Sequence, residues 1–327
     1  MPDSAILTFT DPHEYQAAVR ASDAKFIVTA PGKYRAELTR INLHRLWMQR
    51  GWDSLPRVAH TAVHKDRLPI LFLADVHQTP IHHCGKEMSA GEIVFGSSGA
   101  EHYYRTPMAS HWASMSLTPE ALAAAGQFLV GQELTAPAVT NLIRPPPELM
   151  SRLQRLHEAA GRLAATAPDI LAHPEVARAM EQELVRTMVA CLTRGMAVEA
   201  GGTGNRCVPV MQRFEQVLEA NQGRALYLAE ICAEIGVADR TLRAHCQEHL
   251  GMSPHRYLWL RRMHLVRRAL ALADPTATTV TVVATDHGFG ELGRFAVSYR
   301  KLFGETPSTT LRRPPDHRPI VEDQPFR

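Results

Sequence analysis

The chain carries two similar stretches in its last third, ICAEIGVADRTLRAHCQEHLGMSP at residues 231–254 and VVATDHGFGELGRFAVSYRKLFGETP at residues 282–307. Each has a small residue early on, a turn glycine followed by an apolar residue, and a second segment with an apolar seam. Each closes with Gly-x-[Ser/Thr]-Pro. A helix, a glycine turn and a second helix form the helix-turn-helix unit, whose second helix enters the major groove of DNA. The repeat therefore predicts two such units and a DNA-binding function.

The spacing of the two stretches provides a geometric check. Gly236 and Gly288 lie 52 residues apart, and most of the gap has the pattern of one helix from about His255 to Ala273. At 1.5 Å per residue, about 19 residues span roughly 28 Å. Successive major-groove faces on one side of B-DNA are about 34 Å apart. The sequence therefore predicts a monomer with two reading helices about one helical turn apart.

Composition places the chain among ordinary globular proteins. It has 327 residues, enough for about two domains, with 45% hydrophobic and 21% charged residues. It contains no apolar run long enough to span a membrane and no secretory signal at its N-terminus. Its five cysteines are scattered without CxxC spacing, which is typical of reduced thiols. We therefore expect a cytoplasmic protein that contacts no membrane.

The net charge of +3 is too small to indicate nucleic-acid binding by itself. Between Cys207 and Arg313, however, fourteen Lys or Arg residues stand against ten Asp or Glu residues. The positive surplus therefore lies where the repeat lies, which modestly favours the DNA-binding interpretation.

The first half of the chain has a different pattern. About 30 residues are predicted to form a short arm, and residues 35–117 contain short apolar runs between turn residues, which is typical of a small β-sandwich or barrel. Thr118 followed by Pro119 predicts the start of a helix that ends near Val130. Two further amphipathic helices are expected before residue 194. They either complete the core of their own domain or meet a partner subunit.

Domain boundaries follow from these changes of pattern. We expect an effector-sensing and dimerisation domain over residues 1–194, with the β-barrel over residues 35–117 and helices over 119–194. The Gly-rich stretch at residues 195–206 predicts a flexible linker. A DNA-binding domain over residues 207–313 and a C-terminal tail over 314–327 complete the chain.

The apolar seams of the two second helices define which side chains face outward. In the first unit Leu242, Cys246 and Leu250 share the inner side. The outward positions of both units are the candidate DNA-binding residues: Arg240, Thr241, Arg243, Ala244, Gln247, Glu291, Arg294, Val297, Ser298, Arg300 and Lys301. Base reading is assigned to Arg240, Arg243 and Arg294, because arginine makes bidentate contacts with guanine.

Other arginines are given a less specific role. The pairs Arg261-Arg262 and Arg267-Arg268 on the linking helix, together with Arg300-Lys301, are expected to meet phosphate or water. The alternative for any single arginine is that it belongs to a solvated face.

At these positions the segment from Met211 to Arg313 resembles the DNA-binding domain of the AraC/XylS family of bacterial transcription regulators. The matching residues are core, turn and basic positions of both units: Leu228, Ala229, Cys232, Gly236, Val237, Arg240, Leu242, Arg243, Leu250, Gly251, Pro254, Tyr257, Arg261, Met263, His287, Gly288, Phe289, Arg294, Phe295, Tyr299, Phe303, Gly304 and Pro307. The resemblance implies transcription regulation, usually activation through contact with RNA polymerase.

The chain departs from the family pattern at four positions. Ala238 replaces the usual serine N-cap, and Cys246 replaces the usual core phenylalanine. Ala244 and Val297 stand at outward positions where many members carry arginine. The reading of bases is therefore expected to depend on Arg240, Arg243 and Arg294.

Residues 35–130 resemble, more weakly, the N-terminal domain of a subgroup of these regulators. The likeness is carried by AGEIVF at residues 90–95 and GAEHYYR at residues 99–105. It implies a cupin-type barrel that binds a small effector and often dimerises. Glu101, His102 and Arg105 are the candidate effector-binding residues, and the effector itself is not identified by the sequence.

The first half of the chain also contains residues that could bind a metal. The residues His77, His82, His83, Cys84, Glu87 and His102 have the right ligand chemistry. However, no pair has a recognised spacing, and strand alternation sends His82 and His83 to opposite faces. We therefore predict no metal and no cofactor.

The fold class is accordingly predicted as α+β: an N-terminal cupin-like β-barrel with a helical appendage, and an all-α C-terminal domain with two helix-turn-helix units. The function is predicted as sequence-specific transcription regulation, with promoter DNA, RNA polymerase, a small effector and a second copy of the chain as partners. No catalytic motif was found, so the chain is not expected to be an enzyme. The alternatives are a metal-dependent cupin-type enzyme fused to a DNA-targeting module, and a regulator whose N-terminal domain only dimerises.

Overall fold

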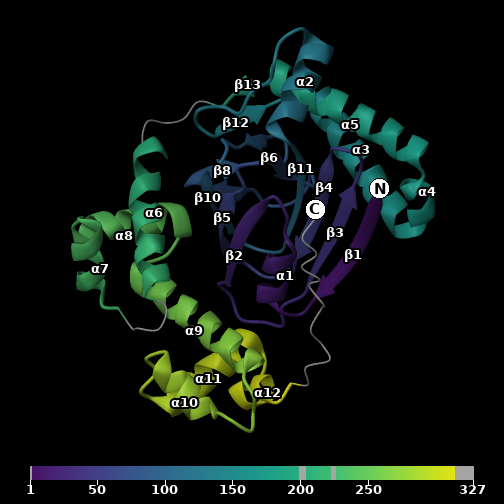
Figure 1. Cartoon of the computed structure of the whole chain (residues 1–327). Coiled ribbons are helices and arrows are strands. Elements are labelled where there is room, and N and C mark those ends of the chain that lie inside the picture. The colour runs from purple at the N-terminus through teal and green to yellow at the C-terminus, as the bar shows by residue number, and fades with distance from the viewer. Residues whose placement is uncertain (1, 199–203, 222–225, 314–327) are drawn as a thin grey trace.

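The computed structural model describes residues 2–198, 204–221 and 226–313. Two antiparallel sheets occupy the first half of the chain, and the last third is helical (Figure 1). The predicted α+β class is confirmed. The expected tail at residues 314–327 lies outside the described residues, as do residues 199–203 of the expected linker.

The larger sheet has eight strands in the order β1-β3-β4-β11-β6-β9-β12-β13. Their bounds are Asp3–Phe9 (β1), Ala36–Asn42 (β3), Trp47–Asp53 (β4), Ser110–Leu117 (β11), Leu68–Leu73 (β6), Ile93–Phe95 (β9), Asn141–Arg144 (β12) and Met196–Ala197 (β13). The smaller sheet has the order β2-β5-β10-β7-β8. Its strands are Ser22–Val28 (β2), Arg57–Val63 (β5), Glu101–Thr106 (β10), Ile81–His83 (β7) and Lys86–Met88 (β8).

The expected barrel is not closed. Within the described residues no strand pair joins an edge of the larger sheet to an edge of the smaller one, so the two sheets face each other as a sandwich. The same apolar–polar alternation serves a sandwich and a barrel, because both have one buried face. Closure depends on strand tilt and stagger, which the pattern of the sequence does not specify.

The expected N-terminal arm is also wrong. Strand β1 pairs with β3 along its whole length, the helix α1 (Pro12–Ala18) follows, and β2 begins the smaller sheet. Tyr15 of α1 is fully buried, and its hydroxyl accepts a hydrogen bond of 2.8 Å from the indole Nε1 of Trp112. The segment therefore closes the sandwich at one end.

Strand β11 shows how the layers are separated. Trp112 and Ser114 border a cavity between the sheets, whereas Ala113 and Met115 pack with the helices on the outer face of the larger sheet. This alternation follows from the two-residue period of a strand. At β11 the larger sheet is therefore buried on both faces.

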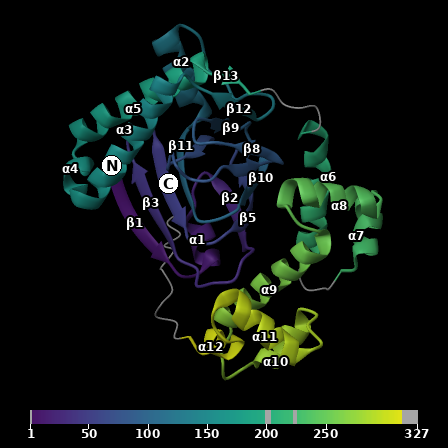
Figure 2. The ribbon, with the colours of Figure 1, turned by 180° about the vertical axis from the view of Figure 1, so that it is seen from behind.

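The helices on that outer face are α2 (Pro119–Val130), α3 (Pro147–Thr166), α4 (Pro168–Ala172) and α5 (Pro174–Arg194). Thr118 caps α2 as predicted, since its side chain accepts from the amide of Ala121. Apolar side chains of α3 and α5 join the core of the larger sheet, and Figure 2 shows both helices along that face. The two helices therefore complete the core of their own chain, and a partner subunit is not needed to cover this apolar face.

Seven helices form the described part of the C-terminal region. They are α6 (Gly204–Ala220), α7 (Leu228–Ile235), α8 (Asp239–Leu250), α9 (Pro254–Leu272), α10 (Val280–Asp286), α11 (Leu292–Phe303) and α12 (Pro307–Leu311). The α7–α8 pair is the first predicted unit and the α10–α11 pair is the second. The two units lie at opposite ends of α9 (Figures 1 and 2).

The first reading helix lacks a side-chain N-cap. Ala238 has the extended backbone of a cap residue but no side chain that can accept from the first turn. At the corresponding place in α9, Ser253 accepts from the amide of Arg256 at 3.3 Å. We predict that Ala238→Ser raises the free energy of unfolding by about 1 kcal/mol, because it satisfies one open amide.

Urea denaturation of the full chain measures this change, with Ser253→Ala as the opposite change in a matched cap. An Ala238→Ser variant that is no more stable than the parent chain would contradict the capping argument.

Candidate nucleic-acid interface and sensor cavity

Helix α8 presents a clear outer face. Its inner side chains Leu242, Cys246 and Leu250 are fully buried in the core of the helical region. The five residues expected to face outward are all exposed: Arg240, Thr241, Arg243, Ala244 and Gln247. The predicted separation of the two faces is therefore found in the structure.

Helix α11 repeats this arrangement. Phe295, Tyr299, Leu302 and Phe303 are buried, and Val297 on the opposite side is 71% exposed. Among the other outward residues, Glu291, Arg294, Arg300 and Lys301 are exposed and Ser298 is partly buried. Both second helices thus carry free side chains of the length and type that major-groove binding requires.

Two of the candidate arginines lie in local ion pairs. Arg243 lies 2.9 Å from Asp239 one turn earlier, and Arg294 lies 3.0 Å from Glu291. All four side chains are largely exposed, and such pairs contribute about 0–1 kcal/mol. The guanidinium groups can therefore exchange these partners for DNA at little cost.

Helix α9 holds the two units apart. It contains 19 residues, which at 1.5 Å per residue gives a length of about 28 Å. Ser253 and Pro254 start it as a cap and a first-turn proline, and Tyr257, Leu260, Met263, Val266 and Leu270 bury one side of it. Its predicted extent and role as the connecting helix agree with the structure.

The predicted role of two arginines on α9 is wrong. Arg261 was expected to meet phosphate or water, but its guanidinium pairs with Glu219 at 2.6 Å. Arg267 is only 5% exposed and lies at the contact with the N-terminal half. Helical periodicity alone could not reveal either pairing, because Arg261 is covered by α6 and Arg267 by the sandwich, which is more than 200 residues away in sequence. Arg268 next to it is exposed.

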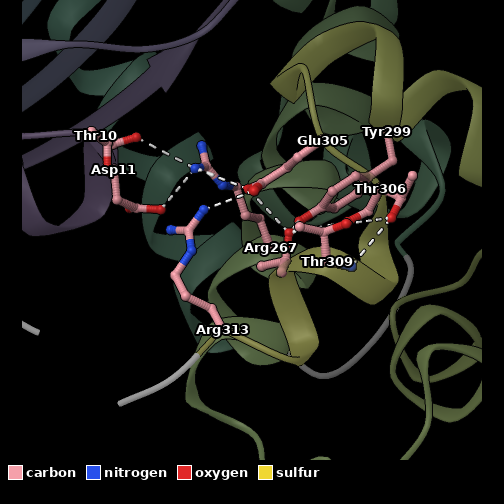
Figure 3. A network of polar contacts seen from close by, with 9 residues as sticks. Thr10, Asp11, Arg267, Tyr299, Glu305, Thr306, Thr309 and Arg313 are labelled. Carbon is pink, nitrogen blue, oxygen red and sulfur yellow. Dashed lines mark hydrogen bonds and ion pairs between the residues drawn. The ribbon is translucent and has the colours of Figure 1, made fainter. Parts of the chain in front are cut away.

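Arg267 is the centre of a polar network, drawn in Figure 3. One of its nitrogens lies 3.2 Å from an Asp11 carboxylate oxygen and 3.4 Å from one of Glu305. The other oxygen of Glu305 pairs with Arg313 at 2.7 Å. Asp11 precedes α1, whereas Glu305 lies between α11 and α12. A single buried cation therefore joins the sandwich, the linking helix and the second helix-turn-helix unit.

Further contacts extend this interface. The His264 ring of α9 contacts the Val28 carbonyl at 3.2 Å, and the Gly32 amide donates to the Leu302 carbonyl at 3.2 Å. Tyr103 of β10 packs edge-on against His249 of α8 and joins the core of the helical region. The outer face of the smaller sheet is thus covered by α8 and α9.

The inner face of the smaller sheet borders a cavity of about 80 Å³ between the two sheets. Its lining is mainly apolar and includes Phe26, Leu71, Val94 and Trp112, with polar groups at a few positions. His102 is one of these, and desolvation lowers its pKa to about 4. A mainly apolar cavity with a few polar groups is typical of a small-molecule site.

The three predicted effector-binding residues divide between the two faces of β10. His102, Tyr104 and Thr106 line the cavity, and alternation turns Glu101, Tyr103 and Arg105 to the other side. Glu101 pairs with His60 at 2.9 Å. Arg105 lies against Gly251, where a Cβ atom would come within 2.6 Å of its side chain. Of the three, the structure therefore brings only His102 to the cavity.

Two groups of metal-ligand residues come together in the described residues. One is His83, Cys84 and His102, and the other is His245, Glu248 and His249 on α8. Both ring nitrogens of His249 are buried without a hydrogen-bond partner. The sequence did carry a signal for the second group, a His-x-x-Glu-His spacing on one helix face. The first group could not be recognised, because the pairing of β7 with β10 brings its members together.

Comparison with known proteins agrees with this geometry. A helix-turn-helix domain model matches residues 231–313. The XylDLEGF operon transcriptional activator 2 of Pseudomonas putida is 34% identical over 129 residues, which cover 39% of this chain and 78% of that protein. The transcriptional activator RhaS of Salmonella arizonae is 26% identical over 264 residues, which cover 77% of this chain and 88% of that protein. Other relatives align over less of their length, 45% for a probable thc operon regulatory protein of Rhodococcus erythropolis.

Among solved structures, the AraC-like transcriptional activator CuxR is similar with a TM-score of 0.41 and 16% identity, over 85% of this chain and 99% of that one.

Two exposed reading helices at the ends of a connecting helix define a DNA-binding protein of the helix-turn-helix class. The chain belongs to the AraC/XylS family of transcriptional regulators. It is therefore a DNA-binding transcriptional regulator. Among its described helices, none is both long and apolar enough to cross a membrane.

The network around Arg267 leads to a prediction about stability. Replacing this buried guanidinium by Met leaves Asp11 and Glu305 without their shared cation, and removing one partner of a buried pair costs about 3–5 kcal/mol. We expect Arg267→Met to lower the free energy of unfolding by about 3 kcal/mol. The exposed neighbour Arg268 gives the control, since Arg268→Met should change the free energy of unfolding by less than about 0.5 kcal/mol. Equal effects of the two variants in chemical denaturation would contradict the assignment.

His264 makes the same interface sensitive to acid. Burial lowers its pKa from 6.5 to about 4, so the unfolded chain takes up a proton before the folded one does. The contribution of His264 to the free energy of unfolding is fully present above pH 6.5 and is lost as the pH falls towards 4. We predict that between pH 7 and pH 5 the parent chain loses about 2 kcal/mol more than a His264→Gln variant does. Parallel pH profiles of the two proteins would show that His264 does not contribute.

Proposed function

We propose that this regulator binds two successive major grooves on one side of promoter DNA, with α8 in one groove and α11 in the next. The observation that carries the proposal is the pair of exposed helix faces at the two ends of α9, whose length of about 28 Å approaches one helical turn of B-DNA. The DNA-binding domain is taken to span residues 207–313, and the sensor domain residues 1–194. The proposed activity is regulatory rather than catalytic.

Base reading is assigned to a small set of side chains. Arg240, Arg243 and Arg294 are the long exposed donors that suit guanine, and Gln247 suits adenine. The exposed Val297 offers an apolar contact for a thymine methyl group. Arg300 and Lys301, together with Thr241, Ala244, Glu291 and Ser298, complete the proposed contact surface as groups that border the groove or meet phosphate.

The sensor is proposed to bind a small, mainly apolar effector in the cavity between the sheets. The cavity of about 80 Å³ is about half the size of an engineered cavity of about 150 Å³ that holds benzene, so in this state it admits only a ligand smaller than benzene. His102 supplies a polar contact at the wall. Glu101 and Arg105 lie on the opposite face of β10, so they do not touch the ligand. Their proposed role is to transmit changes at the cavity to α8.

Regulation is proposed to arise from thermodynamic linkage between effector binding in the sensor and DNA binding by the helical region. An effector that binds the cavity differently in two arrangements of the sensor and the reader shifts the population that engages DNA. The relatives are named as operon activators, and on that basis we propose activation through RNA polymerase. A homodimer in the cytoplasm would place four reading helices on paired half-sites.

The base-reading assignment is tested by binding the full chain to a set of single-base-pair variants of the DNA upstream of its own gene, at one stated salt concentration. We expect Arg240→Ala and Arg294→Ala to lose about 1–3 kcal/mol of discrimination at one or two base pairs each. Lys301→Ala is the matched control. It should weaken binding to all sequences alike and reduce the slope of log K against log salt concentration by about one. Uniform weakening by the arginine variants would reduce them to phosphate contacts.

A further inference from the structure

A two-residue hairpin joins β7 to β8 and carries a cysteine at its tip. His83 pairs with Lys86 across the hairpin, which leaves Cys84 and Gly85 as the loop. Both loop residues have positive φ, 47° for Cys84 and 82° for Gly85. Such loops strongly favour Asn-Gly or Gly-Gly, since other side chains are strained there. The Cys84 amide is held by the Tyr103 carbonyl at 2.8 Å, which fixes the thiol next to the neighbouring strand.

The pairing of β7 with β10 brings two histidines to this thiol. His83 lies opposite Tyr104 in the antiparallel register, so that it shares the inner face of the sheet with His102. The Nε2 atom of His83 lies 3.0 Å from the Nδ1 atom of His102 and 3.6 Å from the Cys84 sulfur. All three potential ligand atoms lie within 4.8 Å of one another. Both histidines are buried and Cys84 is half-buried.

Two hydrogen-bond contacts converge on one ring nitrogen of this group. A ring nitrogen carries either one proton or one lone pair, so the Nε2 atom of His83 cannot serve both neighbours fully. A tetrahedral ion with bonds of about 2.0–2.1 Å to nitrogen and about 2.3 Å to sulfur sets its ligands about 3.3 Å apart for N and N and about 3.6 Å apart for S and N. The spacings of 3.0 and 3.6 Å are close to these two values.

We propose that His83, Cys84 and His102 bind a zinc-like, thiophilic metal ion in tetrahedral geometry. Two imidazoles and one thiolate are the ligand set that such ions select, and the fourth position is left for a water molecule or a further donor. The site is built on two strands and a fixed loop, with the Tyr104 ring packed on His83 at 5.0 Å between centroids. The His102 Nδ1 and Cys84 Sγ atoms, which lie within 4.8 Å of each other, would approach to about 3.6 Å to share the ion.

The position of the site relates it to both halves of the molecule. His102 also lines the cavity between the sheets. On the other side, the hairpin tip abuts α8, because a Cβ atom at Gly85 would come within 2.7 Å of Glu248. The ion would therefore lie between the cavity and the first helix-turn-helix unit, and the proposal rests on the distances among these three side chains rather than on effector binding.

The test is a metal titration of the full chain after chelator treatment, with Zn²⁺ alone as the probe and a chromophoric chelator as competitor. We expect one tightly bound ion per chain. Replacing Zn²⁺ by Co²⁺ should give the visible absorption of a tetrahedral ion and a thiolate charge-transfer band in the near ultraviolet. A chain that binds no Zn²⁺ in competition with the chelator, or a Co²⁺ spectrum without a thiolate band, overturns the proposal.

Variants locate the ion. Cys84→Ser, His83→Gln and His102→Gln should each weaken Zn²⁺ binding by more than about 100-fold, since even an outer-shell partner contributes about 10- to 100-fold. His82→Gln is the matched control on the opposite face of β7 and should bind as the parent chain does. Wild-type affinity in all three ligand variants contradicts the assignment. Loss of binding only in His245→Gln or His249→Gln would move the ion to α8 and equally contradict it.

A measurement on the unaltered chain covers the case in which a ligand variant does not fold. Cys84 is half-buried, whereas Cys191, Cys232 and Cys246 are buried. Zn²⁺ should therefore slow alkylation of Cys84 at least about 10-fold, because a metal-bound thiolate is shielded from the reagent. Mass spectrometry of the labelled peptide reads this directly. An unchanged rate of alkylation at Cys84 overturns the proposal without any substitution.

Discussion

The buried charge of Arg267 is the interaction on which the arrangement of the two halves depends. A guanidinium that is 5% exposed needs partners, and here they come from both sides of α9, Asp11 before α1 and Glu305 after α11. Neither carboxylate is near the other in sequence, so the charge is satisfied only when the sandwich and the second helix-turn-helix unit are docked together. This one cation therefore contributes both to the position of α9 on the sheet and to the position of the second reading helix.

Strand β10 lies between the cavity and helix α8. One face of the strand borders the cavity through His102 and Tyr104, and the other face carries Tyr103 against α8. A change in the cavity has to cross only the thickness of one sheet to reach the first reading helix. The outer faces of α8 and α11 stay exposed in this arrangement, so that docking on the sandwich leaves the proposed DNA contacts free. The cavity and the proposed DNA-contact surfaces are thus adjacent without sharing residues.

Local pattern predicted the helical region well and the sandwich only in part. The apolar seams, the turn glycines and the connecting helix α9 are set by near neighbours in sequence, and each of these features is present in the structure. The N-terminal strand, the open sheets and the buried state of Arg267 depend on contacts between distant segments. The convergence of His83, Cys84 and His102 belongs to the same class, because it follows from the register of β7 on β10. The exposure of the candidate reading residues could be predicted for the opposite reason, since it depends only on the helical period and not on distant segments.

The most direct test of the account is a hydroxyl-radical footprint of the full chain on the DNA upstream of its own gene, at low protein concentration and one stated salt concentration. The account predicts two protected patches per bound chain on one side of the duplex, about one helical turn (about 34 Å) apart. A single protected patch per chain, or two patches on opposite sides of the duplex, would contradict the claim that α9 holds two reading helices in register with the DNA.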